Sequence, residues 1–152
     1  MGTNWAYVST GMNHTVAIGG DGSLWAWGNN ISGQLGDGTQ GEGNYSNIPI
    51  RIGTDNNWRY VSAGAFYTMA IRTDGTLWAW GNNGYGRLGD GTATQRSMPV
   101  RVGSDYNWIS ASAGSQHTMA IGVDGSLWVW GNNSFGVLGD GTRINHRTRS
   151  LS

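Results

Sequence analysis

Residues 74–83 read DGTLWAWGNN, and this stretch decides the fold because the chain carries it three times. The other two copies read DGSLWAWGNN at residues 21–30 and DGSLWVWGNN at residues 124–133. An Asp-Gly pair ahead of a short apolar segment is the strongest local signal for a β-hairpin, and we expect a two-residue type I′ turn at each copy. The Gly after the second Trp then ends the strand. Each copy therefore predicts the second half of a hairpin.

The sequence around this stretch repeats as well, with a period of about fifty residues, inside a single region that spans residues 1–152. Each repeat contains three of the nine Trp residues. The three repeats are residues 5–57, 58–107 and 108–152. The strands expected in the second repeat are residues 58–63, 67–72, 76–80 and 98–102. Four short strands per repeat, with no sustained 3.6-residue period, predict an all-β chain with essentially no helix.

The third strand of each repeat is apolar on both faces. Successive side chains of a strand point to opposite sides, so Leu24 and Ala26 share one face while Trp25 and Trp27 share the other. A sheet with one face in water would alternate apolar and polar residues instead. Burial on both sides is what a β-propeller blade of four antiparallel strands needs, because each blade is sandwiched between its neighbours. The six residues assigned to this structural core are Trp25, Trp27, Trp78, Trp80, Trp128 and Trp130.

The two prolines, Pro49 and Pro99, fall in the fourth predicted strand. Proline cannot donate to a β-ladder, so this strand belongs at the outer edge of the blade. Residues 147–152 stand where the third repeat should have its fourth strand, but they lack the proline and the alternating apolar residues. Three blades cannot close a ring, since propellers have about four to eight. We therefore expect a partial propeller, or half of a six-bladed ring formed when two chains self-associate through their blade faces, with an open array as the other outcome.

The second repeat resembles the repeat of the regulator of chromosome condensation family. The resemblance rests on VSAGAFYTMAI at residues 61–71, the stretch quoted above, GRLGDGT at residues 86–92 and PVRV at residues 99–102. It implies a β-propeller of four-stranded blades, usually seven of them. It also implies a range of functions, which among family members include nucleotide exchange on a small GTPase, ultraviolet sensing in plants and inhibition of β-lactamases.

Two of these functions are not expected here. The plant photoreceptor of the family uses Trp in the segment before its His-Thr pair, and the equivalent segments at residues 11–15, 64–68 and 114–118 contain no Trp. The exchange factor carries a family-specific insertion that this chain does not show. The resemblance therefore supports the fold and leaves the function to be argued from the residues.

The charge and composition limit the classes of partner that we expect for this chain. Nine Arg and no Lys balance nine acidic residues, so no basic stripe is available for nucleic acid. No apolar run approaches the roughly 20 residues of a membrane-spanning helix. The absence of Cys removes disulfides and thiolate metal sites but leaves the cellular compartment open.

The sequence offers weak candidates for metal binding. His14 and His117 occupy equivalent positions, but Tyr67 replaces them in the second repeat, which favours a hydrogen-bonded structural role. Three Asp-Gly pairs in the loops after the third strands begin at Asp37, Asp90 and Asp140. Each of these loops offers one carboxylate, whereas calcium takes six to eight oxygen ligands, so we expect turns and no metal site.

Function in a repeat scaffold is expected where the copies differ, because the shared positions are already used by the fold. The copies differ in the turn after the first strand, in the Gly-rich loop after the third strand, and in the loop before the fourth strand, at residues 40–47, 93–97 and 143–147. Aromatic and Arg side chains are the usual anchors of protein interfaces. The candidate protein-binding residues are Phe66, Tyr85, Arg87 and Phe135.

The function expected from these observations is a non-catalytic scaffold that binds a protein and needs no cofactor. Two alternatives stay open. Aromatic faces also suit sugars, so the paired Trp residues would serve as stacking platforms in a carbohydrate-binding propeller module. A small hydrolase or lyase on a propeller frame is the second alternative, although the sequence shows no paired carboxylates, no nucleophile beside a base and no phosphate loop.

Overall fold

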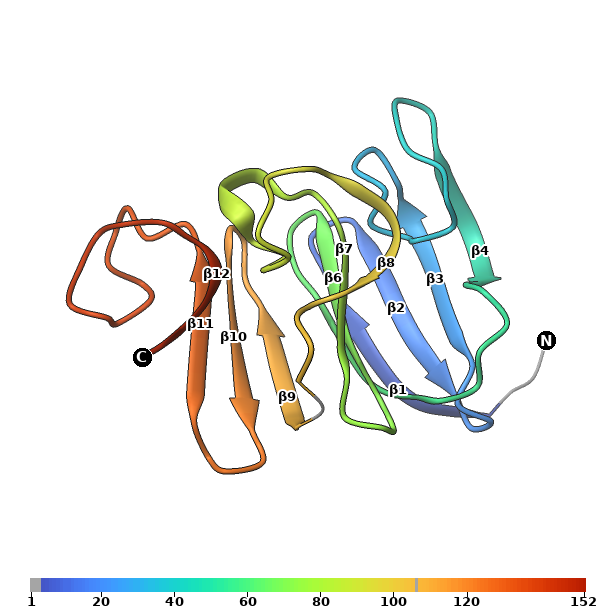
Figure 1. The fold of residues 1–152 in the computed structure, drawn as a ribbon. Coiled ribbons are helices and arrows are strands. Elements are labelled where there is room, and N and C mark those ends of the chain that lie inside the picture. The colour runs from blue at the N-terminus through green and yellow to red at the C-terminus, as the bar shows by residue number, and fades with distance from the viewer. Residues whose placement is uncertain (1–3, 106) are drawn as a thin grey trace.

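A computed structural model describes residues 4–105 and 107–152, which form three antiparallel sheets of four strands each (Figure 1). The first sheet contains β1 (Trp5–Thr10), β2 (His14–Gly19), β3 (Leu24–Asn29) and β4 (Tyr45–Arg51). The second contains β5 (Trp58–Ala63), β6 (Tyr67–Arg72), β7 (Leu77–Gly81) and β8 (Arg96–Arg101). The third contains β9 (Trp108–Ala113), β10 (His117–Gly122), β11 (Leu127–Gly131) and β12 (His146–Leu151). The expected all-β fold is confirmed, and one 3₁₀ turn, η1 (Gly84–Gly86), is the only helical element in the described part of the chain.

The strands of every sheet are ordered as in the sequence, with the fourth strand at one edge. The prolines therefore stand on an edge strand, as predicted. The last segment also forms a strand, since β12 pairs with β11 although it lacks a proline. Nowhere in residues 4–105 or 107–152 is there a helix long and apolar enough to cross a membrane.

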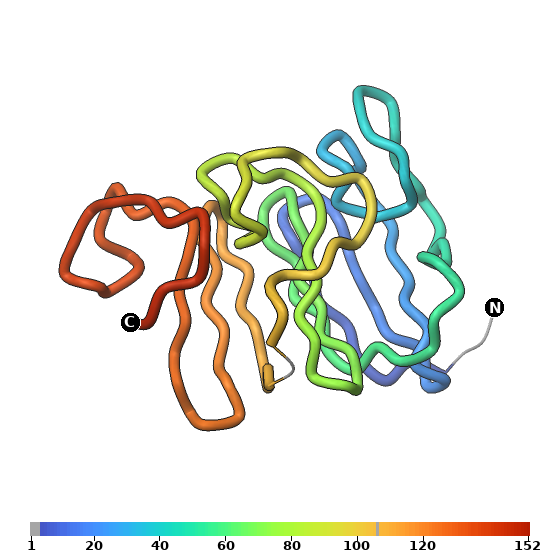
Figure 2. The backbone as a smooth tube through the Cα atoms, in the orientation of Figure 1, coloured from blue at the N-terminus to red at the C-terminus, as the bar shows by residue number. Residues whose placement is uncertain are grey.

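The three sheets, which we call blades 1 to 3, stand side by side, with blades 1 and 3 at opposite ends of the row (Figure 2). Their first strands lie next to one another, on the side where a propeller has its axis. The Ser9 hydroxyl of β1 accepts a hydrogen bond from the Ala63 amide of β5 at 3.0 Å, and the Ser62 hydroxyl of β5 accepts one from the Ala113 amide of β9 at the same distance. The repeat of this contact shows that successive blades are joined in the same way.

The core lies between blades and not within one. Leu24, Leu35 and Ile52 of blade 1 pack against Trp58 and Trp80 of blade 2. The equivalent residues of blade 2 pack in the same manner against blade 3. Burial on both faces of the middle sheet is thus supplied by its two neighbours, which explains why its third strand is apolar on both sides.

The hairpin between the second and third strands differs from the expected type I′ turn. Gly22 has a φ of +80°, but Asp21 before it does not have a positive φ, and a type I′ turn needs both. The Gly22 amide donates to the Gly19 carbonyl at 2.9 Å, and the Gly19 amide donates to the Ser23 carbonyl at 2.9 Å. This is a type I turn followed by a glycine bulge. Asp21 caps the turn by accepting hydrogen bonds from the amide and hydroxyl of Ser23.

Candidate functional site

The four predicted binding residues belong to loops at one end of the strands, the upper end in Figure 1. Because the strands run alternately up and down, the turn after each first strand and the loop after each third strand meet there. The Asn82 amide donates to the Phe66 carbonyl at 2.9 Å, which joins these two segments within blade 2. We call this end the loop face. It consists of residues 11–13, 64–66 and 114–116 together with residues 30–44, 82–95 and 132–145.

A buried Asn holds each long loop of the loop face in shape. In blade 2 the Asn83 side-chain nitrogen donates to an Asp90 carboxylate oxygen at 3.0 Å, and the Asn83 side-chain oxygen accepts a hydrogen bond from the main-chain amide of Leu88 at 3.0 Å. The same carboxylate oxygen also accepts the amide and hydroxyl of Thr92. In blade 1 the Asn30 side chain likewise donates to Asp37 and accepts the Leu35 amide. The aspartates are therefore fixed within the loops by polar contacts of their own.

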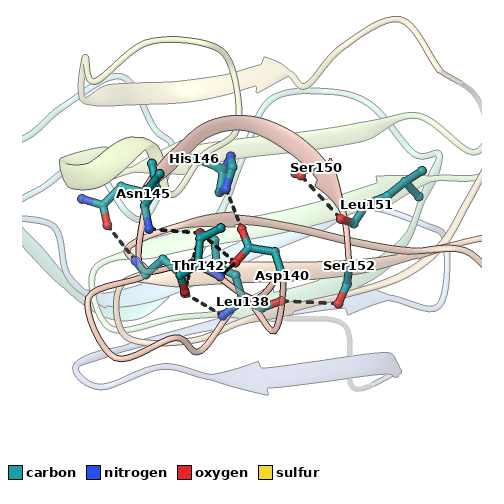
Figure 3. Close-up of polar contacts among 10 residues, drawn as sticks. Leu138, Asp140, Thr142, Asn145, His146, Ser150, Leu151 and Ser152 are labelled. Carbon is teal, nitrogen blue, oxygen red and sulfur yellow. Dashed lines mark hydrogen bonds and ion pairs between the residues drawn. The ribbon is translucent and has the colours of Figure 1, made fainter.

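Blade 3 repeats this network around Asp140, as Figure 3 shows. One carboxylate oxygen of Asp140 accepts the amide and hydroxyl of Thr142, and the other lies 2.7 Å from the His146 ring nitrogen. The pKa of Asp140 is lowered to about 2, mainly because the carboxylate accepts a hydrogen bond from the Thr142 amide. Across residues 4–105 and 107–152, no three His, Asp or Glu side chains gather in a group able to hold a metal ion.

Two aromatic residues stand at equivalent positions of neighbouring loops and reach into solvent. Tyr85 is 48% exposed and Phe135 is 90% exposed, whereas the equivalent Ser32 of blade 1 is buried. Tyr85 has a φ of +63° and is the one non-glycine residue with a positive φ in the described part of the chain. This conformation costs about 1–2 kcal/mol. Phe66 is partly exposed on the same face, so three of the predicted residues are accessible aromatic side chains.

Arg87 differs from the expected solvent-exposed anchor because it is buried, with 6% of its surface exposed. Its guanidinium donates to the Gly84 carbonyl at 3.0 Å and to the Ser115 carbonyl of blade 3 at 2.9 Å. Burial lowers the pKa of Arg87, but an arginine stays protonated in proteins. Arg87 is thus a bridge between blades 2 and 3. The loop position and the variation among copies suggested a surface residue, and neither pattern reveals that the next blade folds over this side chain.

The main chain of Arg87 takes part in a contact that repeats between blades. Its carbonyl accepts the Thr118 hydroxyl at 2.7 Å and the Trp130 indole N–H at 2.8 Å. One blade earlier, the Gln34 carbonyl accepts Thr68 and Trp80 in the same way, both at 2.9 Å. We call this pair of hydrogen bonds onto one carbonyl the interblade clamp.

The clamp also determines which ring nitrogen of His14 carries a hydrogen. The Nε2 atom of His14 lies 2.9 Å from the Thr68 hydroxyl oxygen. That hydroxyl has one hydrogen and gives it to the Gln34 carbonyl, so the imidazole must be the donor. Burial lowers the pKa of His14 to about 4. His14 is therefore a neutral structural residue, and in blade 2 the Tyr67 hydroxyl reaches Thr118 at 2.9 Å from the equivalent position.

The six Trp residues assigned to the core divide into two groups. Trp80 and Trp130 are fully buried, whereas Trp25, Trp27, Trp78 and Trp128 are half-buried. Trp27 occupies the same place in its blade as Trp80, but no described sheet covers that side of blade 1. Sugar stacking on Trp80 or Trp130 is prevented by their burial.

Both ends of the row consequently expose apolar residues that are buried in the middle blade. The face of blade 1 that points away from blade 2, which we call its leading face, exposes 41% of Trp5 and 60% of Val8. The face of blade 3 that points away from blade 2, which we call its trailing face, exposes 41% of Ile121 and 38% of Leu127. The equivalent Ile71 and Leu77 of blade 2 are fully buried. The carbonyl of Val137 lies on this trailing face at the position of a clamp acceptor.

The sequence pattern of the Regulator of chromosome condensation (RCC1) repeat matches residues 21–71 and 74–121. A second pattern of the same repeat matches residues 5–34, 58–87 and 108–137. The chain is 37% identical over 91 residues to the Ultraviolet-B receptor UVR8 of Arabidopsis thaliana. The matched segment covers 59% of this chain and 20% of the receptor. It is 34% identical over 84 residues to the human Probable E3 ubiquitin-protein ligase HERC6, covering 55% of this chain and 8% of that protein. The chain thus spans a fifth or less of these relatives.

Solved structures resemble the fold over nearly the whole chain. Yeast RCC1 (Prp20), in a crystal structure with Kap60, superposes with a TM-score of 0.87 at 23% identity, covering 97% of this chain and 37% of that one. Human WBSCR16 superposes with a TM-score of 0.84 at 24% identity and the same coverage. At these identities the likeness supports the fold alone.

Proposed function

Because the chain belongs to the regulator of chromosome condensation (RCC1) repeat family, we propose that it is a non-catalytic scaffold that binds another protein through its loop face. One observation carries the proposal. Tyr85 and Phe135 place exposed aromatic rings at equivalent positions of two neighbouring loops, and each of these loops is held by its own Asn–Asp network. Rigid loops lower the entropic cost of binding, and aromatic side chains are typical interface anchors.

The family relatives are compatible with this proposal. A solved structure of yeast RCC1 contains Kap60, and another concerns the binding of Prp20p to Gsp1p and histones. Those partners belong to those proteins. They illustrate that a propeller of this kind can offer a surface to a protein.

The test compares proteins captured by the purified chain with those captured by loop-face variants. Tyr85→Gly suits the backbone, because glycine adopts a positive φ without strain, and Phe135→Ser removes the most exposed ring. Val123→Ser is the matched control, since Val123 is 64% exposed in the hairpin at the opposite end of blade 3. Proteins that the wild-type chain captures by cross-linking should be lost in both loop-face variants and kept in the control. A partner set unchanged by the loop-face variants would overturn the proposal.

The proposed scaffold also self-associates through its two end faces. The leading face of blade 1 offers Thr15 and Trp27 at the donor positions of the clamp, and the trailing face of blade 3 offers the Val137 carbonyl at the acceptor position. A head-to-tail contact would bury apolar area on both faces, and a standard interface buries about 1,200–2,000 Å². Such contacts close into a ring if the rotation permits and otherwise continue as an array.

Light scattering at micromolar concentration tests this association. Twice the chain mass of 16.3 kDa supports the six-bladed dimer, and larger species support an array. Leu127→Glu places a charge on the trailing face and should give the single-chain mass, while Val123→Glu should not. A wild-type chain that stays monomeric at these concentrations would exclude the association.

A further inference from the structure

Each blade pairs the first Trp of its first strand with a Trp of its third strand. The ring centroids of Trp58 and Trp78 are 6.0 Å apart, with an angle of 77° between the ring planes. Those of Trp108 and Trp128 are 6.1 Å apart at 74°, and those of Trp5 and Trp25 are 5.9 Å apart at 86°. The three blades thus build the same edge-to-face aromatic corner.

In blade 2 this corner holds a guanidinium. The Arg72 Cζ atom lies 4.0 Å from the centroid of Trp78 and 4.6 Å from that of Trp58. The Asp55 carboxylate pairs with the same guanidinium at 2.6 Å. A cation over an aromatic face gains electrostatic energy from the ring quadrupole, and a nearby carboxylate adds to it.

Blade 3 reaches the same arrangement with a different residue. Gly122 replaces the arginine at the end of β10, but Arg149 enters from β12. Its Cζ atom lies 5.5 Å from the centroid of Trp108 and 6.0 Å from that of Trp128, and Asp105 pairs with it. Arg72 and Arg149 therefore reach equivalent corners from different strands. The pair of indoles thus accommodates a guanidinium whichever strand supplies it.

Blade 1 has the corner but neither arginine. The β1–β2 register pairs Trp5 with Gly19, as that of β5–β6 pairs Trp58 with Arg72. Pro49 stands two residues before the partner of Trp25 in β4, where blade 3 has Arg149. In place of a side chain there is an open pocket of about 300 Å³. Its lining residues are Asn4, Trp5, Gly19, Gly20, Asp21, Ser23, Trp25 and Pro49.

The polar residues of this pocket suit a cation. The Trp25 indole donates to the Ser23 hydroxyl at 2.8 Å, and that hydroxyl bonds to the Asp21 carboxylate, so the ring and the carboxylate have fixed positions. Hydrogen bonds from Ser23 lower the pKa of Asp21, which keeps it negatively charged at neutral pH. In blade 2 the equivalent of Asp21 is Asp74, whose pKa is lowered by hydrogen bonds within its turn and in part by the charge of Arg72. The carboxylate that pairs with Arg72 is Asp55.

We propose that the Trp5–Trp25 pocket binds the guanidinium of an arginine side chain presented by another protein. A planar guanidinium stacks on an indole face and still donates to a carboxylate at its edge, which a lysine ammonium does less well. The pocket lies beside the β2–β3 hairpin, at the opposite end of the strands from the loop face. Binding of arginine at this pocket is therefore independent of protein binding at the loop face.

The direct test is a titration of the ¹⁵N-labelled Leu127→Glu chain, in which no second copy covers the leading face of blade 1, with the peptide acetyl-Gly-Arg-Gly-amide, followed by NMR. The indole N–H signals of Trp5 and Trp25 should shift, and the isosteric peptide with neutral citrulline should bind at least about tenfold more weakly. The lysine peptide should fall between the two. Equal binding of the arginine and citrulline peptides would overturn the proposal. A response of the same signals to galactose but not to the arginine peptide would also overturn it, in favour of a sugar site.

Two variants fill the pocket in ways that the chain already uses. Gly19→Arg copies Arg72, and Pro49→Arg copies Arg149. A Cβ at Gly19 meets the Ser23 and Asp21 side chains at 2.7 and 2.8 Å, so these must shift slightly, whereas Pro49→Arg leaves β2 untouched and serves as the second variant. Both should abolish peptide binding, and Val123→Arg, which adds the same charge at an exposed hairpin, should not. Unchanged binding in the folded pocket-filling variants would refute the assignment.

Discussion

The buried ring of His14 predicts that the protein loses stability as the pH falls below neutrality. Burial lowers the pKa of His14 from 6.5 to about 4 in the folded protein, whereas the ring in the unfolded chain keeps its ordinary pKa. Between these two values the unfolded chain binds a proton that the folded protein does not bind. The free energy of unfolding therefore decreases as the pH falls from about 6.5 toward 4. Since one pH unit is worth about 1.4 kcal/mol, the loss from His14 approaches about 3 kcal/mol over this window.

Urea unfolding followed by Trp fluorescence, at pH values from about 7 to about 5, measures about 2 kcal/mol of this loss. The matched control is His14→Tyr, which copies Tyr67 of blade 2 and removes the titrating group while keeping a partner for Thr68. Its stability should depend much less on pH. The remaining slope should come from His117, whose pKa is also lowered by burial. If the His14→Tyr variant lost stability as steeply as the wild type, the assignment of a neutral, buried His14 would be wrong.

Three further predictions concern stability and use the same unfolding assay. Trp80→Ala should cost about 3–5 kcal/mol because the ring is fully buried, and the half-buried Trp27→Ala should cost clearly less when both are measured in the Leu127→Glu chain, in which no second copy covers the leading face of blade 1; equal costs there would contradict the difference in burial. Arg87→Ala should cost about 2 kcal/mol, since two carbonyls lose a charged donor, and a neutral effect would contradict its role as a bridge. Tyr85→Gly should leave stability unchanged or raise it by up to about 1 kcal/mol, and a large loss would show that the ring packs against the fold.

The strands were predictable from the sequence because their signals are local. Period-two patterning and glycine punctuation place β5 and β6 at the expected residues, and the prolines identify the edge strand. The predicted type I′ turn was wrong, because Asp-Gly fits both a type I′ turn and a type I turn with a glycine bulge. The choice between them depends on how the Gly19 amide and carbonyl pair across the hairpin.

The binding residues were harder to predict because burial in a repeat protein depends on neighbouring copies. Trp27 and Trp80 have the same local sequence and differ in exposure only through what lies against them. Arg87 looks like a loop residue until blade 3 is placed over it. The blade 1 pocket does have a signal in the sequence, since Gly19 and Arg72 are equivalent positions, but its meaning depends on knowing that Arg72 lies on a pair of indoles.

The interblade clamp receives its hydrogen bonds on a main-chain oxygen, which has a consequence for how such a chain can grow. Gln34 and Arg87 have unrelated side chains, yet both present the same acceptor to the following blade. A tandem duplication or a recombination between repeats would therefore preserve the joint without any compensating substitution at this position. A library that randomises residue 34 should keep the Thr68 and Trp80 bonds in most members, apart from proline and from residues too large for the buried site. New arrays can thus be assembled by unequal crossing-over without loss of this main-chain contact at the junction.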